Sequence, residues 1–116
     1  MGFFKSKEEK IAILEKENEF YDSQIETKKR ELEKLEKTLN HDNNRLQSER
    51  QKIQASMNNG NPDDDFRKNY RIKEIDRTIH DMKVMINGTL VDLKRDIEHF
   101  ERKIKKNEAK IGSLKN

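Results

Sequence analysis

Residues 57–66 read MNNGNPDDDF and contain the only proline of the chain. Gly60 suits the C-terminal cap of a helix, because glycine adopts the left-handed conformation without a steric penalty. Asn61 suits an N-cap and Pro62 a first helical position, and the aspartates of residues 63–65 suit a first turn, where the helix dipole favours negative charge. One helix is therefore expected to end, and a second to begin, within this stretch.

On the N-terminal side of this turn, one series of residues recurs every seven positions. Every member except Asn18 is aliphatic: Ile11, Asn18, Ile25, Leu32, Leu39, Leu46 and Ile53. A second series three residues further on is apolar only at Leu14, Tyr21 and Leu35. Two such series are typical of a coiled-coil seam, and this seam is expected to be poorly filled beyond Leu39.

On the C-terminal side, the same seven-residue spacing returns. Its members are Ile72, Ile79, Ile86, Leu93, Phe100, Asn107 and Leu114, with the companions Ile75, Met82, Leu90, Ile97, Ile104 and Ile111. Two amphipathic segments joined by a short turn predict an all-α, antiparallel two-helix coiled-coil hairpin. We expect helices over about residues 6–57 and 63–112 and a turn over about 58–62.

The register of the hairpin follows from the numbering, because facing residues of antiparallel helices have numbers with a constant sum. With a sum of 125, the two series pair layer by layer, and the midpoint falls in the turn. This register places Leu39 beside Ile86 and Asn18 opposite Asn107. A lone polar layer in an apolar seam fixes register at some cost in stability, so Asn18 and Asn107 are predicted to set it.

The composition restricts the classes of protein and of function. Charged residues make up 42% of the chain and hydrophobic residues 30%, with no cysteine and a formal charge of +3. Such a chain forms long helices more readily than a compact globule, so we expect a flexible extension over residues 1–5 and a single hairpin domain over 6–116.

No nucleophile–base pair, glycine-rich phosphate loop or metal-ligand spacing is found, so no enzyme activity, cofactor or metal is expected. Nucleic acid is not an expected partner, and the lack of cysteine and of a signal peptide pattern favours a cytoplasmic protein.

Some apolar residues are not used by this register. The predicted protein interface consists of Ile75, Met82, Met85, Phe66 and Tyr70. Ile75 would face Arg50, and Met82 would face Asn43, so neither has a good partner in the opposite helix. Apolar patches of this kind mark interfaces, although scattered surface residues with no role are the alternative. A homodimer or a hetero-complex formed through helices, such as a four-helix bundle or a larger coiled-coil assembly, would bury them.

The chain opens MGFFKSKEEK, and a hairpin would bring this segment to the basic C-terminal end. Ser6 and Glu9 form a capping box, so Ser6 has a structural role apart from the acylation pattern M-G-x-x-x-S. Aromatic residues beside cations suit an anionic lipid surface or an acidic partner. A possible membrane or partner foot comprises Phe3, Phe4, Lys5, Lys7, Lys10, Arg102, Lys103, Lys105 and Lys106.

Together these patterns predict a non-enzymatic coiled-coil interaction or assembly module that acts as an adaptor, scaffold or small partner protein. The alternative is a peripheral membrane adaptor that makes weak contact with anionic lipid through Phe3, Phe4 and the basic end of the hairpin.

Overall fold

The computed structural model describes residues 5–58 and 60–116, and two α-helices account for nearly all of them. Helix α1 comprises Lys7–Ala55 and helix α2 comprises Pro62–Lys115, and no strand occurs in the described ranges. The predicted all-α helical hairpin is confirmed. Helix α1 ends two residues before the predicted boundary and α2 continues three residues beyond its own. Gly88 lies inside α2 without interrupting it.

The turn differs from its prediction in how α1 ends. The chain leaves the helix at Ala55, where the Ser56 amide donates to the Ile53 carbonyl at 3.1 Å. Asn58 has a φ of 64° and Gly60 a φ of 90°, so two described residues of the turn adopt the left-handed conformation. Gly60 is therefore not the helix cap, because α1 ends too early for it, and it serves the turn itself.

The start of α2 follows its prediction. The Asn61 side-chain oxygen accepts from the amides of Asp63 and Asp64 at 3.1 and 3.2 Å, and Pro62 is the first helical residue. Asp65 turns its carboxylate back and accepts from the Asn58 amide at 3.0 Å. The first turn of α2 therefore holds the connection in place as well as complementing the helix dipole.

Ser6 caps the start of α1, which is one half of the predicted capping box. The Glu9 amide donates to the Ser6 hydroxyl at 3.1 Å, and the Lys10 amide donates to the Ser6 carbonyl at 3.0 Å. The first of these bonds satisfies an amide donor that the first turn of a helix otherwise leaves free, and the second is the first regular hydrogen bond of the helix.

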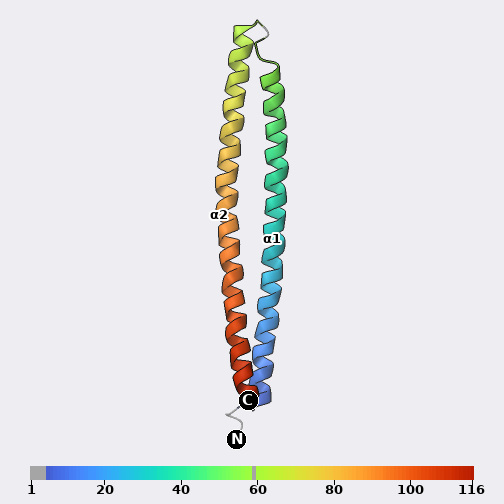
Figure 1. Cartoon of the computed structure of the whole chain (residues 1–116), viewed down its shortest axis with the longest axis vertical. Coiled ribbons are helices and arrows are strands. Elements are labelled where there is room, and N and C mark those ends of the chain that lie inside the picture. The colour runs from blue at the N-terminus through green and yellow to red at the C-terminus, as the bar shows by residue number, and fades with distance from the viewer. Residues whose placement is uncertain (1–4, 59) are drawn as a thin grey trace. The chain divides into compact units, whose positions relative to one another are not determined.

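The chain divides into two compact units. The terminal unit comprises the described residues of Met1–Leu32 together with Val91–Asn116, and the turn unit comprises those of Glu33–Leu90. In each unit a segment of α1 lies beside a segment of α2 (Figure 1). The expectation of a single domain over residues 6–116 stays a prediction.

The seam of the terminal unit contains the polar layer that the register predicts. Asn107 is buried, and its side-chain amide donates to Asn18 Oδ1 at 3.0 Å and to Glu17 Oε2 at 3.1 Å. The Asn18–Asn107 contact confirms this layer of the predicted register. The rings of Tyr21 and Phe100 stack nearby with centroids 5.7 Å apart. The buried apolar residues of this unit are Ile25, Leu93, Ile97 and Ile111.

The seam of the turn unit is better filled than the sequence suggests. Its core cluster consists of Leu46, Ile75 and Ile79, with Ile53 and Met82 packed against it. Ile72 and Ile86 are also buried.

Ion pairs also join the helices of the turn unit. Arg50 Nε and Asp76 Oδ1 lie 2.9 Å apart, and Arg71 Nη2 and Glu49 Oε1 also lie 2.9 Å apart. Hydrogen bonds with Glu49, and next with Glu74, raise the pKa of Arg71 above its ordinary value. Both arginines are partly solvated, so we expect these pairs to fix the alignment of the helices more than to stabilise them.

Candidate interaction surfaces

The predicted protein interface separates into a buried part and an exposed part. Ile75 has no exposed surface, and Met82 packs against the core cluster, so neither belongs to an exposed strip. The prediction that they lack intramolecular partners is wrong. A seam residue inserts among four residues of the facing helix rather than meeting only the one opposite. Ile75 therefore packs in the same cluster as Leu46 and Ile53, while the charged end of Arg50 binds Asp76.

The other predicted interface residues lie on the surface of the turn unit. Phe66 is 73% exposed, Tyr70 62% and Met85 69%. Val84, which the predicted interface omits, is 60% exposed on the same helix. We call these four side chains the outer apolar face. They account for every large exposed hydrophobic residue in the described part of the turn unit.

The outer apolar face is a consequence of helical spacing. Tyr70 and Val84 are two heptads apart, and Phe66 precedes Tyr70 by one turn, so the three side chains lie along one side of α2. Met85 lies about 100° further round. The spacing of two heptads from Tyr70 to Val84 is the signal that could have placed Val84 in the predicted interface.

A shallow groove lies at the turn end of this face. Phe66, Asn69, Tyr70 and Lys73 line a space of about 430 Å³. All four come from consecutive turns of α2, so the groove belongs to one helix surface and does not enter the seam. Such a surface suits the side chains of a neighbouring helix rather than an enclosed small molecule.

The terminal unit has its own exposed apolar residues. Ile13 is 40% exposed, Phe20 58% and Val91 53%. Phe20 packs edge-on against Tyr21, with ring centroids 5.9 Å apart, and so extends the stack of Tyr21 on Phe100 to the surface.

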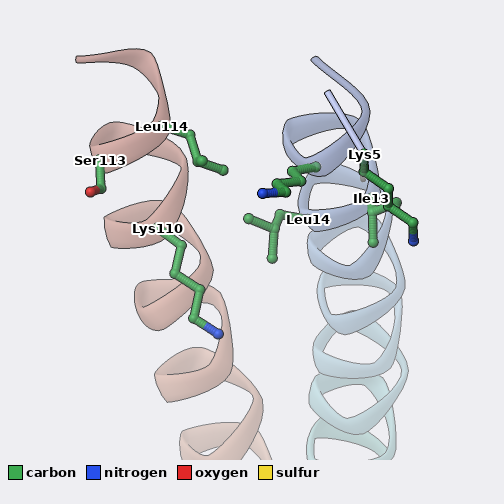
Figure 2. Close-up of a pocket in the computed structure, with 7 residues that line it drawn as sticks. Lys5, Ile13, Leu14, Lys110, Ser113 and Leu114 are labelled. Atoms are coloured by element: carbon green, nitrogen blue, oxygen red, sulfur yellow. The ribbon is translucent and has the colours of Figure 1, made fainter. Parts of the chain in front are cut away.

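A larger groove opens where α1 begins and α2 ends. This base groove has a volume of about 460 Å³ and is lined by Lys5, Lys10, Ile13, Leu14, Lys110, Ser113 and Leu114. Leu14 and Leu114 point into the space between the two helices (Figure 2). Among the described residues, three lysines and no acidic residue border the groove, so an apolar floor is combined with positive charge.

Only some residues of the predicted membrane or partner foot line the base groove. Lys5 and Lys10 line the base groove, and Lys110, which the predicted foot omits, joins them. The C-terminal basic residues of the foot lie instead along the surface of α2. Arg102 and Lys105 share one small depression with Glu98 and Glu101, which offset their charge. Lys103 and Lys106 border another depression, Lys7 is exposed at the start of α1, and Phe3 and Phe4 lie outside the described residues.

Two other kinds of site are missing from residues 5–58 and 60–116. No group of three or more histidine, aspartate or glutamate side chains could hold a metal ion. Neither helix is long and apolar enough to cross a membrane within these ranges. The described surfaces offer association through apolar contact and charge.

Comparisons with known proteins give no match: no family model, no curated protein and no solved structure resembles this chain significantly.

Proposed function

We propose that this protein is a non-enzymatic assembly module that binds a partner helix through the outer apolar face of α2. The exposure of Phe66, Tyr70, Val84 and Met85 carries the proposal. These side chains face solvent although the hairpin has already filled its own seam, so only a partner can bury them. An adaptor or scaffold role in the cytoplasm, which the absence of cysteine favours, is part of the same proposal.

The energetics support association through this face. Burial of one large apolar side chain stabilises a complex by roughly 1.5–3 kcal/mol. Association costs about 4–15 kcal/mol in lost translational and rotational freedom. Four such side chains therefore offset much of that cost, and a partner helix lying along α2 meets three of them in succession, as in other helix-in-groove contacts.

Photo-crosslinking in the native host tests this function. A photoreactive phenylalanine analogue replaces Tyr70 in one variant and Lys83, an exposed residue elsewhere on α2, in the control. We expect a discrete protein adduct from position 70, of either the same chain or another, and little or none from position 83. Equal adducts from both positions, or none from either, would argue against an interface at this face.

The base groove favours a second candidate function, contact with an anionic membrane. Its aliphatic floor suits an acyl chain, and Lys5, Lys10 and Lys110 suit the phosphate of a head group. A helix needs three or four apolar anchors spread over several turns, whereas this groove offers a short aliphatic floor. A lipid bilayer therefore fits the base groove better than an acidic helix does.

Vesicle co-sedimentation tests the membrane candidate. We expect the protein to sediment with phosphatidylcholine vesicles only when they contain phosphatidylglycerol. Each lysine near such a surface contributes about 1 kcal/mol, so K5Q/K10Q/K110Q should lower partitioning by about two orders of magnitude. The matched control K29Q/K34Q/K83Q removes the same charge from exposed lysines outside the base groove. Equal losses in the two triple variants would exclude a specific role for the groove.

A further inference from the structure

Seven residues of α2 form a strip whose spacing reads the same in both directions. The members of the strip are Phe66, Tyr70, Lys73, Arg77, Asp81, Val84 and Gly88. Successive members are four, three, four, four, three and four residues apart, and Arg77 lies at the centre. All seven are exposed and all lie in the turn unit. We call this set the outer strip. Arg77 precedes the buried Ile79 by two positions, or about 200° of rotation, so the strip lies opposite the seam.

We propose that the outer strip binds the outer strip of a second copy of this chain, with the two α2 helices antiparallel about a twofold axis at Arg77. The inference rests on the proposed assembly function and identifies the partner. Steps of three and four residues keep a strip on one side of a helix. In a twofold contact each residue before the axis meets one after it, and a symmetrical spacing lets every position meet a counterpart.

The charges of the strip are arranged for this pairing. Lys73 and Asp81 lie four residues before and after the centre, so each meets the other across the twofold axis. Within the part of the chain that the structure describes, neither makes an ion pair. Both are therefore available for a partner. By symmetry, the contact contains two Lys73–Asp81 pairs. These pairs favour the antiparallel orientation, because parallel helices would place like charges opposite one another.

The side chains at the two ends of the outer strip are complementary in size. Phe66 meets Gly88 of the second copy, and no heavy atom lies within 4 Å of the position that a Cβ at Gly88 would occupy. The large ring therefore has open space to fill at the glycine. Tyr70 meets Val84 in the same register, so two aromatic–small pairs flank the charged centre on each side.

Arg77 is the one position that meets itself, and the repulsion between the two guanidinium groups opposes association. The Asp81 carboxylate of the second copy lies about one helical turn, or 6 Å, along the axis from this point. An arginine side chain can span that distance, so each guanidinium has an opposite charge within reach. The apolar pairs at the ends of the strip supply the remaining stabilisation.

Sedimentation velocity on the full-length chain, over a concentration series, tests the pairing. We expect the wild-type chain to dimerise. K73D and D81K should each weaken the dimer at least tenfold, because each places like charges opposite one another at two symmetrical points. The double variant K73D/D81K restores opposite charges and should return the affinity to within about threefold of wild type.

The control K83D changes an exposed lysine of α2 outside the strip and should leave the dimer unchanged. Circular dichroism should show the same helix content for all variants, since the altered side chains are exposed. A wild-type chain that remains monomeric up to about 100 µM would overturn the pairing. Failure of the double variant to recover, or equal weakening by K83D, would overturn it as well.

The outcome of the photo-crosslinking distinguishes this inference from the function on which it rests. A crosslink from position 70 to a second copy, together with the charge rescue, supports both. A crosslink only to another protein, with a monomeric wild-type chain, overturns the pairing and keeps the assembly function. No crosslink from position 70 and no dimer overturn both.

Discussion

The Asn18–Asn107 hydrogen bond joins the two helices in the terminal unit, and we propose that it sets their alignment. Asn107 is buried, and its amide also donates to Glu17. A buried amide that loses its partner costs about 1–3 kcal/mol, whereas replacing both partners by apolar groups can be neutral or stabilising. We therefore expect the contact to provide specificity more than stability.

A double-mutant cycle on this pair tests that role. Asn18→Leu alone should lower the free energy of unfolding by about 1–2 kcal/mol, because the Asn107 amide then loses one of its two acceptors. Asn18→Leu with Asn107→Leu should be at least as stable as wild type. Urea denaturation followed by circular dichroism measures both. A double variant less stable than the single variant would show that the pair stabilises the seam on its own account.

At the residue scale, the sequence alone predicts a feature correctly when that feature depends on neighbouring residues. Asn61 was predicted correctly as a cap because its side chain acts on amides two and three residues away. Gly60 was predicted incorrectly, because where α1 ends depends on contacts across the turn, such as Lys68 Nζ donating to the Ser56 carbonyl at 2.8 Å. A contact between residues far apart in sequence leaves no signal in the local pattern.

At the scale of the elements, the two helices and the polar layer of their register followed from the heptads, but the core of the turn unit did not. Pairing each residue with the one directly opposite places Ile75 against Arg50. In the structure, side chains of neighbouring layers interleave and bury Ile75 completely. The exposed face of α2 was identified in part, through Phe66, Tyr70 and Met85. The base groove was not foreseen as a cavity, because its volume depends on where seven side chains come to rest.

Truncation of Ile75 distinguishes a core residue from an interface residue. Ile75→Ala should lower the free energy of unfolding by about 2–5 kcal/mol, because it leaves a cavity beside Leu46 and Ile79. Met85→Ala, at a side chain 69% exposed, should change it by less than about 0.5 kcal/mol. Thermal and urea denaturation at low protein concentration measure these effects without a contribution from association. Similar losses for the two variants would contradict the assignment of Ile75 to the core.

At the scale of the whole molecule, the two sides of α2 differ in the contacts they offer. The seam side joins α2 to α1 within the chain, through residues such as Ile75 and Asn107. The outer strip lies on the opposite side and is proposed to join two chains. An assembly of this kind brings four helices together through an α2–α2 contact, while each hairpin keeps its own seam. This differs from the four-helix bundle or larger coiled-coil assembly that the sequence suggests, because the contact lies outside both seams.

The most direct test of the outer strip is sedimentation velocity on an equimolar mixture of K73D and D81K chains. Each variant alone should sediment as a monomer, since its own twofold contact opposes like charges. In the mixture, one chain supplies only acidic and the other only basic residues at these two positions. The mixture should form a heterodimer about as stable as the wild-type homodimer. A mixture that sediments as two independent monomers, under conditions in which the wild-type chain dimerises, would contradict the antiparallel pairing of the outer strips.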